Sequence, residues 1–399
     1  MRRWRRLLLI ASMTPLTQKR KTDMIMAILV LAVFWLAYSN GANDNFKGVA
    51  TLYGSGTVSY RTALTWTTIA TLAGSVLSIL LAGSLAKSFT GKGLVPLELT
   101  QSGELLISVA AGGAITIMLA TIVGMPTSTT HALTGALAGV ALVVGHGHAN
   151  LGRLWDSFFL PLLVSPFLAL GFAAVLYPLF RRTRLRLGIT RQTCVCIGDA
   201  APQPVHLMQD GAALIAAPVG GGPSFTLASR EQCIERYDGR VLGVSALALV
   251  NKTHALSGIT VCFARAVNDT PKIAALLLAA GAAGVNWKLG LVAAAMAIGG
   301  LLNSRKVAET MSKRITDLNP GQGLTSNLVT AALVLGASRL GVPVSTTHVS
   351  CGAIFGIGMV SRTARWKTIA QILATWMTTL PMGAALGAAI YWTLTRMGS

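Results

Sequence analysis

The stretch Gly124-Met-Pro-Thr-Ser-Thr-Thr-His131 occurs twice in this chain, and the second copy, 217 residues later, reads Gly341-Val-Pro-Val-Ser-Thr-Thr-His348. Nine of the 16 positions from Gly124 to Gly139 are identical in the second copy. Each copy places a proline and a run of hydroxyls where an apolar helix begins, and both residue types suit a first helical turn. Free backbone N–H groups at the positive end of a helix dipole also bind anions. The hydroxyls could be ordinary helix caps, but their duplication inside an apolar chain favours a pair of anion-binding helix starts.

The composition of the chain indicates that much of it lies in a lipid bilayer. Of its 399 residues, 53% are hydrophobic and only 12% are charged, whereas soluble globular chains carry about 25% charged residues. Apolar runs of near-spanning length recur along the sequence, which predicts an all-α, polytopic membrane protein. Lysine and arginine outnumber aspartate and glutamate by 33 to 13. Because the basic residues gather between the apolar runs, we attribute the excess to retention on the cytoplasmic face and expect no nucleic-acid partner.

The apolar runs divide the chain into two similar parts. We expect an N-terminal extension at 1–23, a first transmembrane repeat at 24–180, a hydrophilic cytoplasmic connector at 181–250 and a second transmembrane repeat at 251–399. The connector is rich in arginine, proline and glycine, and an interfacial helix is expected at its end, over Val241–Val250. Each repeat contains about five apolar runs, which predicts a bundle of about 10–12 spans including discontinuous helices.

An odd number of spans in each repeat places the second repeat upside down relative to the first, which is the inverted-repeat architecture of secondary transporters. Loops on the side of the connector hold 17 Lys or Arg residues, and the opposite loops hold 7, or 14 if the N-terminal extension is included. The connector side is therefore predicted to be cytoplasmic.

A second duplicated element is an Asn-Asp pair with a lysine three residues beyond the aspartate. The two copies are Asn43-Asp44 with Lys47, and Asn268-Asp269 with Lys272. We expect the helix to break at both pairs; at the first, Gly41 and Asn43 let a helix break without strain. An aspartate at membrane depth is costly and is therefore a candidate functional residue. Carboxylate, amide and freed carbonyl oxygens suit a hard cation such as Na⁺. Two carboxylates beside an oxyanion would repel it, and a cation carried along with the anion removes that repulsion, which favours symport.

A carboxylate also bears on which anion is bound. Phosphate near neutral pH keeps a proton that it can donate to Asp44 or Asp269, whereas sulfate has none, so the site favours phosphate. The basic side chains of Lys47, Lys272 and Arg265 could neutralise the carboxylates or contact the substrate, and the sequence leaves both roles open.

The two histidines that end the hydroxyl runs, His131 and His348, have two open roles as well. A histidine within a membrane is most often a hydrogen-bonded packing residue, and proton coupling is the alternative.

At these residues the chain resembles the inorganic phosphate transporter (PiT) family of secondary carriers. The resemblance implies uptake of inorganic phosphate across the cell membrane driven by a Na⁺ or H⁺ gradient, no cofactor beyond that coupling ion, an inverted-repeat helical fold and a homodimer. It implies that phosphate is bound by the hydroxyls of both runs and by the two aspartates: Ser128, Thr129, Thr130, Ser345, Thr346, Thr347, Asp44 and Asp269. It implies that the coupling cation is bound by Asn43, Asp44, Asn268 and Asp269. Thr127 is Val344 in the second copy, so any role for that hydroxyl is one-sided.

Other classes of protein fit the sequence less well. A permease for sulfate or another tetrahedral oxyanion is the alternative within the same class. A membrane-embedded enzyme would need a nucleophile with a base or a metal cluster, and no HExxH or GxSxG context is present. A channel is a third class, but broken helices around a midplane site suit alternating access better than an open pore.

Overall fold

The computed structural model describes residues 15–89, 94–145, 150–190, 193–198, 224–229, 244–281 and 285–397. The chain forms two compact units. The larger unit joins the chain up to Val175 with the chain from Ala255 onward, and the smaller one is Leu176–His254.

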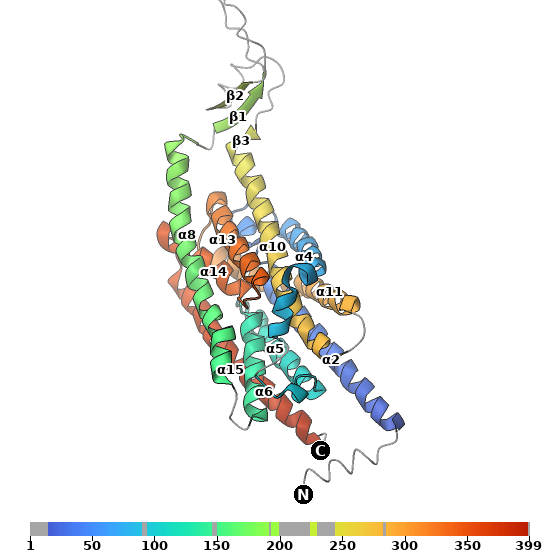
Figure 1. The fold of residues 1–399 in the computed structure, drawn as a ribbon. Helices are drawn as coiled ribbons and strands as arrows, with labels where there is room; N and C mark the ends of the chain where they lie inside the picture. The colour runs from blue at the N-terminus through green and yellow to red at the C-terminus, as the bar shows by residue number, and fades with distance from the viewer. Residues whose placement is uncertain are drawn as a thin grey trace, which may run out of the picture. The chain divides into compact units, whose positions relative to one another are not determined.

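The helices follow one another in the order shown in Figure 1. In the first half they are α2 (Pro15–Asp44), α3 (Ala50–Gly54), α4 (Tyr60–Ser88), the 3-10 turn η1 (Leu97–Leu99), α5 (Gly103–Val123), α6 (Thr129–Val144), α7 (Leu151–Leu154), the π-helical turn η2 (Trp155–Phe159) and α8 (Leu160–Arg186). In the second half they are α10 (Ala246–Ala279), α11 (Val285–Asn303), α12 (Arg305–Glu309), the π-helical turn η3 (Thr310–Arg314), α13 (Pro320–Arg339), α14 (Thr346–Ser361) and α15 (Trp366–Met397).

Several of these helices are long and apolar enough to cross a membrane, which confirms an all-α polytopic membrane protein. Within the described residues there are five: Lys19–Asp44, Gly103–Val123, Gly152–Arg186, Ala246–Ala279 and Trp366–Met397. The pair Trp287–Asn303 and Arg305–Arg314, bent by 68°, would make a sixth span. The expected total of about 10–12 spans stays a prediction.

The helices that carry the two hydroxyl runs are short, as the sequence suggested for the first of them. α6 and α14 have 16 residues each, and at 1.5 Å per residue each covers about 24 Å of the ~30 Å hydrocarbon core. Neither helix is therefore long enough to cross the hydrocarbon core by itself.

The connector adds a small sheet to this helical protein. Strands β1 (Thr193–Gly198), β2 (Ser224–Ser229) and β3 (Val244–Ser245) are antiparallel in the order β2-β1-β3. The expected separate helix over Val241–Val250 is wrong in its described part, because β3 gives way to α10 at Ala246 and that helix runs on to Ala279.

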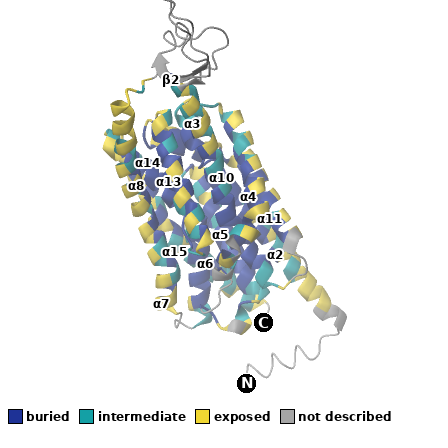
Figure 2. Cartoon of the chain, turned by 45° about the horizontal axis from the view of Figure 1, so that its top comes forward, coloured by how far each residue is buried: buried dark blue, intermediate teal, exposed yellow. Residues whose placement is uncertain are grey.

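Side chains on one face of α2 are buried and those on the other face are apolar but exposed. Leu29, Val33 and Leu36, spaced by four and three residues, are buried, whereas Leu31 and Trp35 are exposed. Figure 2 shows the same division across the bundle, with buried residues in the interior and exposed ones on outer faces such as that of α8. An apolar outer face is expected for a helix in contact with lipid.

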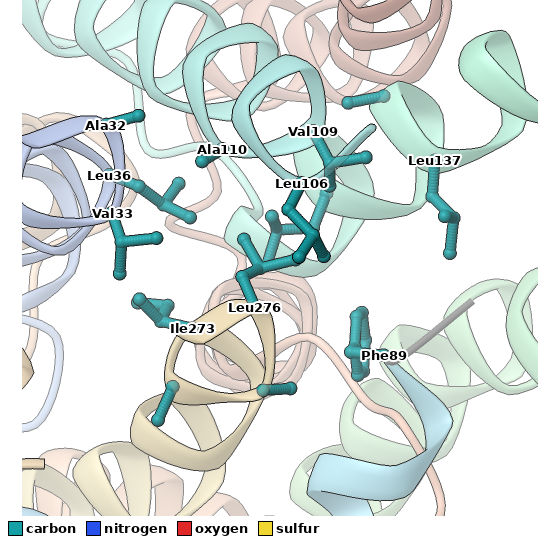
Figure 3. Packing of buried hydrophobic residues seen from close by; sticks show 14 of the residues in the cluster. Ala32, Val33, Leu36, Phe89, Leu106, Val109, Ala110, Leu137, Ile273 and Leu276 are labelled. Carbon is teal, nitrogen blue, oxygen red and sulfur yellow. The ribbon is translucent and has the colours of Figure 1, made fainter. Parts of the chain in front are cut away.

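The apolar interior supports the ends of the segments that carry the Asn-Asp pairs. Figure 3 shows Val33 and Leu36 of α2, Leu106 of α5, and Ile273 and Leu276 of α10 directed into one buried cluster. The first two lie just before the Asn43-Asp44 pair in the chain, and the last two lie just after Asn268-Asp269. Packing thus fixes the position of both pairs.

The duplicated glycines let the two short helices approach their neighbours closely. A Cβ atom at Gly135 or Gly139 of α6 would collide with the backbone of α15, and one at Gly352 would collide with the backbone of α8 at Pro166. Small residues four apart are a common device for close helix contacts within membranes.

The expectation of a helix break at both Asn-Asp pairs is correct for the first pair and wrong for the second. α2 ends at Asp44, and turns over 45–49 lead to α3. α10 runs unbroken through Asn268 and Asp269 with Pro271 inside the helix. Proline removes only one helical N–H, and packing in a buried helix tolerates that loss.

Candidate functional site

Each hydroxyl run begins a buried helix with the same geometry. The Ser128 hydroxyl accepts a hydrogen bond from the His131 N–H at 3.1 Å, and the Ser345 hydroxyl accepts one from the His348 N–H at 3.2 Å. Both serines are extended N-cap residues. They therefore cap their own helices, and the ordinary capping role considered for them from the sequence is observed.

The two runs contact one another through their threonines. The Thr130 hydroxyl donates to the Val344 carbonyl at 3.2 Å, and the Thr347 hydroxyl donates to the Thr127 carbonyl. Thr130 and Thr347 are equivalent in the two copies, as are Thr127 and Val344. Each run therefore donates to the carbonyl at the equivalent position of the other run, as two copies related by a two-fold axis do.

Lys47 connects the first Asn-Asp pair to both runs. Its side chain is buried, and its ammonium group forms an ion pair with Asp44 Oδ1. The same group donates to the Thr347 hydroxyl and to the Thr127 carbonyl, the latter at 3.5 Å. One carboxylate, one hydroxyl and one main-chain carbonyl therefore surround it.

Lys272 repeats this arrangement in the second half. Its Nζ lies 3.6 Å from Asp269 Oδ1, 2.8 Å from the Thr130 hydroxyl and 2.8 Å from the Val344 carbonyl. Each lysine thus binds the aspartate and the carbonyl of its own half and the threonine of the other half.

The amides of the two Asn-Asp pairs hold the loops that precede the hydroxyl runs. Asn43 Oδ1 accepts from the Thr127 N–H at 2.9 Å, and its Nδ2 donates to the Met125 carbonyl at 3.0 Å. Asn268 Nδ2 donates to the Val344 carbonyl at 3.3 Å, and its Oδ1 accepts from the Ser338 hydroxyl at 3.1 Å.

Asn40 lies between the two aspartates, and the sequence analysis did not single it out. Its Nδ2 group is 3.2 Å from Asp44 Oδ2, 3.2 Å from Asp269 Oδ2 and 2.8 Å from the Thr129 hydroxyl. The Thr129 hydroxyl in turn donates to Asp44 Oδ2 at 3.2 Å. The signal that could have found Asn40 is the offset of 225 residues between the Asn-Asp pairs, which makes it the counterpart of Arg265.

Arg265 is buried beside these groups. Its Nη1 donates to Asn40 Oδ1 at 3.1 Å, and its Nη2 donates to Asn45 Oδ1 at 3.2 Å and to the Thr71 hydroxyl at 2.6 Å. Arg265 is thus connected to Asp269 through Asn40.

The two histidines lie together where the helix starts meet. The ring centroids of His131 and His348 are 4.4 Å apart, and the His348 ring stacks on Trp376 at 3.8 Å. His348 Nδ1 is 3.4 Å from the Leu162 carbonyl, and the Trp376 indole donates to the Pro126 carbonyl at 3.2 Å. These contacts support the packing role.

The site carries its own positive charge. Five charged residues are each at most 1% exposed, namely Asp44, Asp269, Lys47, Lys272 and Arg265. Two carboxylates and three cations give the cluster a formal charge of +1, so the repulsion that the sequence analysis expected between the carboxylates and an anion is already offset by the protein. Lys47 and Lys272 are buried in the site and are not loop charges. One comes from each of the two sides, so the difference in positive charge between the sides is unchanged.

The four residues predicted to bind the coupling cation already have partners within the protein. The part of the chain that the structure describes holds no group of three or more His, Cys, Asp or Glu residues suited to a metal. Both carboxylates have ammonium, amide or hydroxyl partners. The side chains of Asn43 and Asn268 bind the main chain of the loops that precede the hydroxyl runs. That these four residues bind a cation stays a prediction.

A cluster of buried charges enclosed by apolar, membrane-crossing helices defines an integral, multi-pass membrane protein that handles a polar solute. Residues 40–387 match the phosphate transporter family. The chain belongs to this family, whose members are transporters and not enzymes, and it is a multi-pass protein of the cell membrane.

Individual relatives agree with this assignment. The chain is 25% identical to a probable low-affinity inorganic phosphate transporter of Mycobacterium leprae, over 94% of this chain and 79% of that one. It is 26% identical to a chloroplastic inorganic phosphate transporter of Arabidopsis thaliana, over 94% of this chain and 73% of that one. A solved structure of a sodium-dependent phosphate transporter shares the fold, with a TM-score of 0.70 and 22% sequence identity. The match covers 94% of this chain and 99% of that one.

Proposed function

We propose that this chain imports inorganic phosphate across the cell membrane by symport with a cation, Na⁺ or H⁺, without any further cofactor. The observation that carries the proposal is the exchange of contacts between the two halves, in which each buried lysine joins an aspartate to the threonine of the opposite hydroxyl run.

The chemistry of these groups suits phosphate. Ammonium groups, threonine hydroxyls and the N–H groups of helix starts are donors for a tetrahedral oxyanion. Asp44 and Asp269 are acceptors for the proton that phosphate retains and sulfate lacks. A formal charge of +1 attracts the anion into the apolar layer.

The exchanged contacts also suit alternating access. Lys47 and Lys272 hold the two halves together at the site, so a substrate that takes over their hydroxyl partners would weaken this connection. We propose that the two halves are inverted repeats that rock about the site, and that the protein is a homodimer.

The test is labelled phosphate uptake by purified protein in proteoliposomes under an imposed Na⁺ or H⁺ gradient. We expect saturable, gradient-driven uptake that arsenate inhibits strongly and sulfate inhibits weakly. Equal inhibition by sulfate would favour a general oxyanion permease, and non-saturating flux that ignores the gradient would favour a channel. Light scattering in detergent tests the homodimer.

A further inference from the structure

We propose that Lys47 and Lys272 are tethered cations that occupy the two places where a coupling Na⁺ would neutralise the carboxylates, so that phosphate transport by this chain needs no Na⁺. This inference rests on the proposed function and names its driving ion as the proton.

The first support is the set of atoms around each ammonium group. Lys272 Nζ contacts a carboxylate oxygen, a hydroxyl oxygen and a main-chain carbonyl oxygen, from Asp269, Thr130 and Val344. Such hard oxygens with a single negative charge are the ligands that a hard cation prefers. An ammonium group has three N–H donors; the Thr130 and Val344 oxygens accept from two of them at 2.8 Å, and the Asp269 carboxylate lies 3.6 Å away as an ion-pair partner.

The second support is that the arrangement is built twice. Lys47 has the equivalent three partners, Asp44, Thr347 and Thr127. Both ammonium groups are held by atoms from both halves of the chain, which is the position where a coupling ion would have to lie to sense how the halves are arranged.

The third support is the charge already present. Arg265 is buried and bound to Asn40, which also donates to both carboxylates. A Na⁺ ion added beside the aspartates would therefore meet like charges in a buried, weakly screened place. Phosphate itself can carry a proton inward, which leaves the proton gradient as the driving force.

The remaining titratable groups near the two ammonium groups are the site's aspartates, His131 on α6, and His348 and Cys351 on α14. None of them has to change protonation for a tethered cation to neutralise its carboxylate.

The first experiment compares uptake by wild-type protein under a pH gradient, with Na⁺ or with choline on both sides of the membrane. We expect rates within about twofold of each other. A tenfold or larger stimulation by Na⁺ would overturn the inference while leaving the proposed function intact. Absence of uptake under every gradient would instead overturn the proposed function.

The second experiment removes the tethered cations. In Lys47→Asn/Lys272→Asn the two carboxylates lose their ammonium partners and gain amide oxygens. We expect uptake in choline to fall at least tenfold and to recover at least tenfold when Na⁺ replaces choline. Lys367→Asn, which changes an exposed lysine, is the matched control and should behave as wild type.

A binding measurement covers the case in which the double variant does not transport. Thermal unfolding in detergent is followed in NaCl and in choline chloride of equal ionic strength. We expect Na⁺ to raise the melting temperature of the double variant and to leave that of the wild type unchanged. Stabilisation of the wild type by Na⁺, or no stabilisation of the variant, would contradict the inference.

Discussion

The two halves of the site share the contacts of their lysines and differ in charge at one buried position. In each half a lysine binds the aspartate of its own half and the threonine of the other. At the position four residues before the aspartate, the first half has Asn40 and the second has Arg265, and these two side chains bind one another. The symmetric contacts connect the halves, while the asymmetric pair gives the site its surplus positive charge.

Removing either aspartate should disturb the symmetric contacts most. We expect Asp44→Asn and Asp269→Asn to abolish coupled phosphate uptake in proteoliposomes. Removing one partner of a buried ion pair also costs about 3–5 kcal/mol of stability. The loss should be larger for Asp44→Asn, because Asp44 also accepts from the Thr129 hydroxyl and lies closer to its lysine than Asp269 does, whose ion pair with Lys272 is 3.6 Å long.

The control for this prediction is Asp317→Asn. Asp317 pairs with Arg365 at 2.8 Å, but both side chains are largely exposed, and such pairs contribute about 0–1 kcal/mol. Uptake should be unchanged in this control. Wild-type uptake by Asp44→Asn or Asp269→Asn would remove that carboxylate from the mechanism.

Making the two halves alike should have the next largest effect. Arg265→Asn places in the second half the residue found in the first, and it removes the guanidinium donors from the oxygens of Asn40, Asn45 and Thr71. Asn45 Oδ1 keeps the Thr71 hydroxyl as a donor. Loss of hydrogen bonds to a charged group costs about 1.5–3 kcal/mol each, and the surplus charge disappears. We expect the KM for phosphate to rise by about tenfold to a hundredfold.

Arg265→Lys separates charge from geometry. It restores the positive charge but cannot reach Asn40 and Asn45 together as a guanidinium does. We therefore expect a KM between those of the wild type and Arg265→Asn. A KM unchanged in both variants would show that the asymmetric pair plays no part in attracting the anion.

Replacing either histidine should have a smaller effect on phosphate uptake. His348 packs between His131 and Trp376, so His348→Phe keeps most of the packing and loses one hydrogen bond to the Leu162 carbonyl, worth about 1 kcal/mol. We expect proton-driven uptake within about threefold of wild type for His348→Phe and for His131→Phe. Loss of proton-driven uptake in either variant would assign a proton-coupling role to that histidine.

The sequence was sufficient to predict the parts of the site that are duplicated along the chain. The duplicated hydroxyl runs and Asn-Asp pairs predicted two helix starts and two carboxylates, and the structure brings both copies together. The 225-residue offset could have identified Asn40 as the counterpart of Arg265, but not its bridge to the second half. That bridge depends on how the helices pack and not on any spacing within one segment.

The lysines and the second Asn-Asp pair show that the sequence does not predict the effects of burial. A lysine near an aspartate at a three-residue spacing predicts an ion pair, but not whether the pair lies at a surface or, as here, is buried. A helix break was also expected at Asn268-Asp269, yet burial of α10 on both sides of the pair keeps that helix continuous.

The smallest effect is expected at the one position of the hydroxyl runs that differs between the copies. The Thr127 hydroxyl lies 2.7 Å from the Thr379 hydroxyl, whereas the contacts of Thr127 with Lys47 and Thr347 use its main-chain carbonyl. Thr127→Val therefore keeps those contacts and loses one buried hydrogen bond, worth about 1 kcal/mol. We expect a slightly lower melting temperature and a KM within about twofold of wild type. Val344→Thr, the reverse exchange, is the matched control. A tenfold rise in KM for Thr127→Val alone would show that this hydroxyl binds phosphate and that the asymmetry between the halves extends into the anion site itself.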